Sequence, residues 1–155
     1  MGLLTPLAVR IGALEWMPRL LPQITATDKL LGRTTGGRVS LLNIAGLPNL
    51  MLTVPGRRTG VPRTVPLLCV PRDGGFLIAG SYFGGPVEPT WVANLEAAGA
   101  GELRYRGVST EFKARQLTGD ERATAWTTMI RTWPNFAVYE KRTARQIKVF
   151  ELIPA

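Results

Sequence analysis

The sequence predicts an α+β protein in which a mostly antiparallel sheet forms a small barrel and helices pack outside it. Short apolar runs alternate with turns rich in glycine and proline over residues 50–117, a pattern typical of strands joined by hairpins. Segments with helical spacing precede, interrupt and follow these strands, so we expect the helices to cover the sheet. The chain has 155 residues, enough for a single hydrophobic core.

The first residues form an amphipathic segment that predicts an N-terminal helix. Apolar side chains recur there at helical spacing, at Leu4, Leu7, Ile11, Leu14 and Leu21. This helix either packs on the core or touches a membrane surface or a second subunit. Charged residues interrupt the segment, so we expect neither a membrane-spanning helix nor a secretory signal. We assign residues 1–38 to an N-terminal helical arm and residues 39–155 to the barrel domain.

The barrel domain begins with two predicted hairpins. Strands at residues 50–54 and 64–70 flank an arginine-rich turn, and Pro66 indicates that the second strand lies at an edge or contains a bulge. The turn Asp73-Gly74-Gly75 leads into a strand at residues 76–81, because glycine readily adopts positive φ. A short helix at residues 28–31 and a strand at residues 39–44 are expected before these hairpins.

The second half of the chain alternates helices with strands. A helix over residues 90–98 ends at Gly99, and a hairpin around Gly107 joins strands at residues 102–106 and 109–117. Thr118 and Glu121 predict a capping box for a helix over residues 120–131. A short helix after Pro134 and a final strand at residues 147–153 complete the predicted fold.

The composition excludes several kinds of site. The net charge is +8, from 19 basic and 11 acidic side chains, which indicates an acidic partner such as nucleic acid, an anionic membrane or a polyanionic small molecule. Because the chain has no histidine, it has no histidine general base and no Ser-His-Asp triad, and we expect no metal site. Cys69 is the only cysteine and lies in an apolar run, so we expect a buried structural thiol.

Three arginines crowd one predicted turn. Arg57, Arg58 and Arg63 alternate with glycine and proline between two strands. An anion such as a phosphate or carboxylate would relieve their mutual repulsion, since guanidinium groups bind both bidentately. The alternative is a solvated hairpin tip. No aromatic residue accompanies the arginines, so we expect no nucleic-acid partner, and the sequence has neither a P-loop nor a dinucleotide-binding fingerprint.

The run GRRTGVPRTVPL, followed by RDGGFLIAGS and PTWVANLEA, resembles the deazaflavin-dependent nitroreductase family, closely over residues 50–98. The resemblance implies a split β-barrel related to the FMN-binding oxidoreductases. It also implies a cytoplasmic, actinobacterial-type enzyme that uses the 5-deazaflavin coenzyme F-420. Such an enzyme would transfer hydride to a small planar electrophile: a quinone, an enone or unsaturated lactone, or a nitroaromatic. FMN is the alternative cofactor.

The resemblance also implies which residues bind the coenzyme. They are Arg57, Arg58 and Arg63 for the phosphate and acidic tail, and Pro66, Leu67, Leu68, Ala79, Ser81, Tyr82, Trp91 and Asn94 around the ring. Trp91 and Asn94 have a structural alternative, as a helix residue packed on the sheet and a side chain that closes a loop. The chain departs from the family pattern at Tyr82-Phe83, where relatives often carry Lys-Gly. This loss of a lysine removes one phosphate contact.

An aromatic stripe near the C-terminus supplies the predicted substrate contacts. Trp133, Phe136 and Tyr139 recur every three residues, where the resemblance implies substrate-side aromatics; a core stripe is the alternative. With no histidine, a tyrosine, a serine or water must deliver the proton, so Tyr139 and Ser81 are the catalytic candidates.

Three other functions stay open from the sequence. They are an FMN-dependent reductase of the same fold, a non-catalytic flavin or deazaflavin binder, and an anion-binding protein at acidic lipid surfaces. A homodimer and a peripheral membrane contact through the N-terminal helix are the further expected associations.

Overall fold

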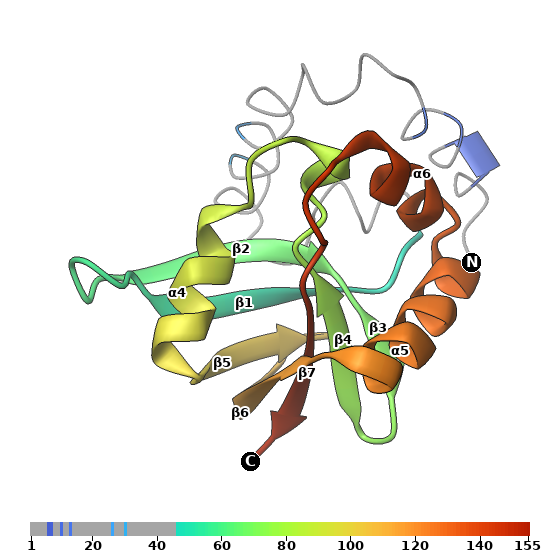
Figure 1. Ribbon diagram of the computed structural model, residues 1–155. Helices are drawn as coiled ribbons and strands as arrows, with labels where there is room; N and C mark the ends of the chain where they lie inside the picture. Colours follow the sequence, from blue (N-terminus) through green and yellow to red (C-terminus); the bar gives the residue numbers. More distant parts are fainter. Residues whose placement is uncertain (1–5, 8–9, 11–12, 14–25, 27–29, 31–45) are drawn as a thin grey trace.

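The structure, a computed structural model, describes residues 46–155 and the isolated positions 6, 7, 10, 13, 26 and 30 (Figure 1). The predicted N-terminal helix, the short helix at residues 28–31 and the strand at residues 39–44 lie outside the described residues. So does the proposed boundary at residue 38. Among the helices that are described, none is long and apolar enough to span a membrane.

The described elements follow the predicted order of strands and helices. They are β1 (Asn49–Pro55), β2 (Pro62–Leu68), β3 (Val70–Arg72), β4 (Gly75–Ala79), the 3-10 turn η2 (Tyr82–Gly84), α4 (Thr90–Ala98), β5 (Ala100–Tyr105), β6 (Val108–Leu117), α5 (Gly119–Thr132), α6 (Asn135–Arg142) and β7 (Val149–Pro154). The predicted bounds of α4 are confirmed, and α5 extends one residue further at each end than predicted.

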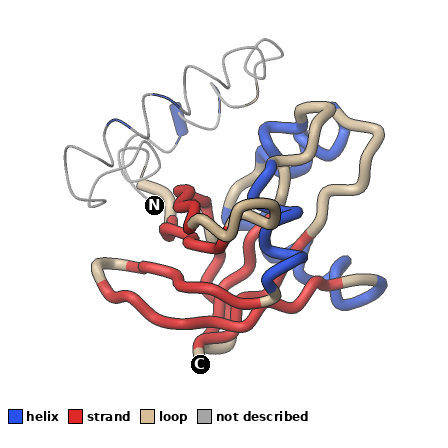
Figure 2. Tube along the Cα trace, turned by 90° about the vertical axis from the view of Figure 1, so that its left-hand side faces the viewer, coloured by secondary structure: helices blue, strands red, loops and turns tan. Residues whose placement is uncertain are grey.

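The seven strands in the described part of the chain form one antiparallel sheet in the order β2-β1-β5-β6-β7-β4-β3. The edge strands β2 and β3 are consecutive in the chain, separated only by Cys69. The sheet therefore curls until one segment passes from one edge to the other, as the split barrel requires (Figures 1 and 2). The prediction that Pro66 lies in an edge strand is confirmed. The predicted continuous strand at residues 64–70 is wrong, because the chain changes sheet edges at Cys69, whose N–H donates to the Pro48 carbonyl at 3.0 Å.

The two faces of the sheet carry separate cores. Adjacent strand residues point to opposite faces, and Leu77 and Ile78 of β4 accordingly belong to different clusters. The inner cluster includes Ile78, Cys69 and the buried face of α4, and it fills the barrel. The outer cluster includes Leu77 and lies under α5 and α6, so the predicted burial of Cys69 and external placement of helices are confirmed.

Local turn chemistry explains the tight hairpins. The pairings Arg72 with Gly75 and Tyr105 with Val108 leave two-residue loops in which both residues have positive φ. Asp-Gly and Arg-Gly occupy these loops, and such backbone twist matches that of paired strands.

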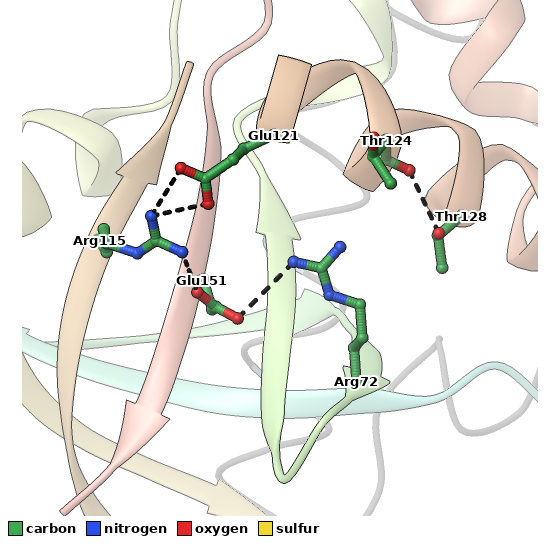
Figure 3. Close-up of polar contacts among 6 residues, drawn as sticks. All are labelled: Arg72, Arg115, Glu121, Thr124, Thr128 and Glu151. Carbon is green, nitrogen blue, oxygen red and sulfur yellow. Dashed lines mark hydrogen bonds and ion pairs between the residues drawn. The ribbon is translucent and has the colours of Figure 1, made fainter. Parts of the chain in front are cut away.

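The predicted capping box at the start of α5 is wrong. Thr118 makes no side-chain cap hydrogen bond. Glu121 instead pairs with Arg115 at 2.8 Å, and Arg115 also pairs with Glu151 at 2.8 Å (Figure 3). Arg72 approaches the same Glu151 at 3.7 Å, so an ion network that joins the start of α5 to three strands replaces the local cap.

Candidate functional site

The arginine turn projects from the end of the β1–β2 hairpin. Strand pairing ends at Pro55 and Pro62, and the Gly56 N–H donates to the Val61 carbonyl at 2.8 Å. Arg57, Arg58 and Arg63 are all exposed. The ion pairs among the described residues include none of their guanidinium groups. The turn therefore offers three cationic groups to an external anion.

Asn94 of α4 fixes the arginine turn. The Arg57 backbone N–H donates to Asn94 Oδ1 at 3.0 Å, and Asn94 is only 6% exposed. Trp91, one helical turn earlier, is buried with its ring at 6.2 Å from that of Phe150 in an edge-to-face arrangement. Both residues thus make the structural contacts that were the alternative to coenzyme binding. Asn94 also lies directly beside the arginine turn, through its hydrogen bond with the Arg57 N–H.

Four of the predicted ring-binding residues lie on β2 and β4. Pro66, Leu67 and Leu68 are half-buried on the edge strand β2. Leu67 packs against the inner cluster, whereas Leu68 and Ala79 of β4 both pack against the outer cluster. β2 and β4 therefore contribute side chains to both clusters, since Ile78 of β4 also belongs to the inner cluster.

A left-handed turn follows β4 and carries Ser81 and Tyr82. Tyr82, Phe83 and Gly84 have φ values of 44°, 54° and 75°. The Gly84 N–H donates to the Ser81 carbonyl at 2.8 Å, and the Gly85 N–H donates to the Tyr82 carbonyl at 2.9 Å. A side chain in this conformation costs about 1–3 kcal/mol per non-glycine residue. The surrounding structure must supply that free energy.

One guanidinium group holds this turn. Arg145 donates from Nη1 to the Gly80 carbonyl at 2.9 Å, from Nη2 to the Ser81 carbonyl at 3.0 Å and from Nε to the Gly85 carbonyl at 3.2 Å. Hydrogen bonds from charged groups contribute about 1.5–3 kcal/mol each, enough to offset the backbone strain. Burial lowers the pKa of Arg145 from its ordinary value, while Glu88 raises it. The guanidinium nevertheless keeps its charge.

The aromatic stripe is buried in the outer cluster. Trp133, Phe136 and Tyr139 are 5%, 3% and 2% exposed. Trp133 Nε1–H donates to the Tyr139 hydroxyl at 3.2 Å, and the Phe83 ring of the left-handed turn lies 5.6 Å from the Tyr139 ring. Tyr82-Phe83 is the pair at which the chain departs from the family pattern, and Phe83 of this pair contacts the aromatic stripe directly.

Burial also sets the protonation of Tyr139. It raises the pKa of the hydroxyl, against the smaller lowering effects of Trp133, Asn135 and Arg142. The hydroxyl therefore keeps its proton at neutral pH.

The prediction from sequence missed two residues of this region. Arg145 holds the turn, and Arg142 donates from Nη1 to the Phe83 carbonyl at 3.2 Å. Arg142 also donates from Nη2 to the Ala13 carbonyl. The sequence indicates these two arginines only as part of a basic run near the last helix and the last strand. Their acceptor carbonyls on the left-handed turn lie about sixty residues earlier in the chain, so the sequence alone does not pair them.

A separate cavity of about 1220 Å³ opens at the other end of β1. Its lining includes Asn49, Met51, Arg104, Arg106 and Arg131. None of the predicted coenzyme or substrate residues borders it. This cavity and the arginine turn are therefore different surfaces of the barrel.

Residues 25–154 match the profile of the F420H2-dependent quinone reductase family. The chain belongs to this family. It is also similar to a solved F420-H2 dependent reductase, FDR-A, with 30% identity and a TM-score of 0.63 over 68% of this chain and 93% of that one. A structure described as a domain-swapped dimer has 29% identity and a TM-score of 0.66 over 82% of this chain and 93% of that one.

A more distant likeness supports the fold alone. HutZ, the heme storage protein from Vibrio cholerae, has 13% identity and a TM-score of 0.53 over 70% of this chain and 82% of that one. The split barrel is thus shared well beyond the reductase family.

The family membership makes this chain a deazaflavin-dependent oxidoreductase that uses coenzyme F-420. The described residues fit such a group. The coenzyme is a polyanion with an aromatic head, and the arginine turn presents three guanidinium groups that no described acidic residue neutralises.

Proposed function

We propose that this reductase transfers hydride to a small planar electrophile, with a quinone as the first candidate and enones, unsaturated lactones and nitroaromatics as the related classes. The arginine turn carries the proposal, because its three exposed guanidinium groups match a polyanionic coenzyme. When bound, the reduced deazaflavin supplies the hydride. The protein works in the cytoplasm under this proposal.

The chain's own residues orient the reactants and exclude water. Arg57, Arg58 and Arg63 hold the phosphate and acidic tail. The ring is bordered by Pro66, Leu67, Leu68, Ala79, Ser81, Tyr82, Trp91 and Asn94. The apolar stripe of Trp133, Phe136 and Tyr139 supports the substrate side through Phe83. Tyr139 or Ser81 supplies a proton to the reduced substrate, because both carry a hydroxyl group that is protonated at neutral pH.

The choice of coenzyme is tested by competition. We expect coenzyme F-420 to bind more tightly than FMN, because only the deazaflavin carries a long acidic tail for the arginine turn. Fluorescence titration of each compound, followed by competition between them, measures the ratio of the two Kd values. Tighter binding of FMN would move the protein to the flavin-dependent branch of the fold. Binding without turnover of any quinone, enone or nitroaromatic would favour a non-catalytic binder.

The role of Tyr139 is tested with Tyr139→Phe. If the hydroxyl is the general acid, turnover should fall by roughly 100-fold or more. If it only orients the substrate, the fall should be about tenfold. The variant also leaves the buried Trp133 N–H without its acceptor, which should lower the free energy of unfolding by about 1–3 kcal/mol. Steady-state rates well below the melting temperature separate the two effects, and an unchanged rate would assign proton delivery to Ser81 or solvent.

We also propose that the protein forms a homodimer, on the strength of the similar structure described as a domain-swapped dimer. Analytical ultracentrifugation across micromolar concentrations measures the mass directly. A single monomeric species throughout would contradict this part of the proposal.

A further inference from the structure

We propose that Arg145 is a positioning residue for the coenzyme: it holds the left-handed turn of residues 80–85 in the shape that Ser81 and Tyr82 need for coenzyme binding. The inference rests on the proposed function, which places these two residues at the coenzyme ring. Arg145 itself is placed outside the coenzyme contacts and acts through the backbone of the turn.

The three carbonyl groups around Arg145 are arranged to match the planar shape of a guanidinium group. Three of its nitrogen atoms donate to three different carbonyls, those of Gly80, Ser81 and Gly85, at 2.9, 3.0 and 3.2 Å. These carbonyls bracket the turn on both sides. A lysine carries a single compact charge on a flexible stem, so it does not reproduce this planar set of contacts.

The turn needs an external anchor. Two successive side-chain-bearing residues, Tyr82 and Phe83, have positive φ, which disfavours this conformation in a free chain. On its other side the turn rests on α6, where a Cβ atom on Gly84 would lie 2.6 Å from the Tyr139 carbonyl oxygen. The turn is thus held between Arg145 and α6, and loss of the Arg145 contacts should allow it to relax.

The connection to the coenzyme runs through two adjacent residues in the first half of this turn, Ser81 and Tyr82. Ser81 contributes a carbonyl that Arg145 binds directly, and Tyr82 follows it with a side chain that is 36% exposed. Strained backbone of this kind clusters at active sites and ligand clamps. Movement of the turn would therefore shift both side chains together.

The test compares Arg145→Lys with Arg122→Lys. Arg122 is a matched control, because it is also half-buried and donates to a backbone carbonyl, that of Ile147, at 3.1 Å from Nε and 2.6 Å from Nη2. Ile147 is two residues from Arg145 in the chain, and within the described part of the chain Arg122 makes no hydrogen bond to residues 80–85.

Two measurements are made on each protein. Hydrogen exchange of the free protein reports on the Gly84 and Gly85 amides, which close the turn. Fluorescence titration gives the Kd for coenzyme F-420. For Arg145→Lys we expect faster exchange at these two amides and a Kd about tenfold higher, the loss equivalent to one charged hydrogen bond. For Arg122→Lys we expect wild-type values of both.

The outcomes are distinct. Wild-type exchange and wild-type Kd in Arg145→Lys would overturn the inference, as would an equal rise in Kd for both variants. If Arg145→Lys does not fold, the wild-type protein still decides, because coenzyme binding should slow exchange at Gly84 and Gly85 about tenfold. No slowing would overturn the inference. A wild-type protein that binds no coenzyme at all would instead overturn the proposed function.

Discussion

Replacing Trp133 by alanine is expected to lower the free energy of unfolding by about 3–5 kcal/mol. The side chain is 5% exposed and belongs to the outer cluster with Met129, Phe136 and Tyr139. Its removal leaves a cavity and also takes away the N–H that donates to the Tyr139 hydroxyl. Urea denaturation of both proteins measures the difference.

A control and an alternative outcome sharpen this test. Val108→Ala shortens an exposed side chain at the start of β6 and should change stability by no more than about 0.5 kcal/mol. If Trp133 instead forms a wall of the substrate pocket, the alanine variant would keep near-normal stability and show a raised KM. That result would contradict the core assignment of the stripe.

The double replacement of Arg57 and Arg63 by alanine is expected to weaken coenzyme binding by about 3–6 kcal/mol, from about 1.5–3 kcal/mol for each lost charged hydrogen bond. Stability should change little, because both side chains are exposed and unpaired among the described residues. The Arg57 backbone N–H keeps its bond to Asn94 in the variant, so the turn should hold its shape. Titration with coenzyme F-420 measures the loss.

The control removes the same amount of charge elsewhere. Arg106→Ala combined with Arg131→Ala lowers the net charge equally at the cavity on the opposite end of β1. Coenzyme affinity should stay within a few-fold of wild type. Equal losses in the two double variants would indicate a general effect of net charge, and unchanged affinity in the Arg57 and Arg63 variant would remove the anion site from this turn.

Local chemistry explains what was predictable in the fold. The bounds of α4 follow from a helical segment ended by Gly99, which has φ of 68° in the structure. The Asp73-Gly74 and Arg106-Gly107 turns follow from the positive φ that glycine accepts readily. These features depend on neighbours in the chain, so a single sequence carries the information. The break at Cys69 does not, because it depends on where the two edges of the curled sheet meet.

The site divides in the same way. The sequence by itself determined the arginine turn, its position between two strands and, through the family resemblance, the coenzyme class. Only the tertiary structure decided that Asn94 holds the turn, that Glu121 pairs with Arg115 instead of capping α5, and that Arg145 anchors residues 80–85. Each of these contacts joins groups that are distant in the chain or on separate elements. Their partners are decided by how the barrel and helices pack, whereas turn and helix signals act over a few neighbouring residues.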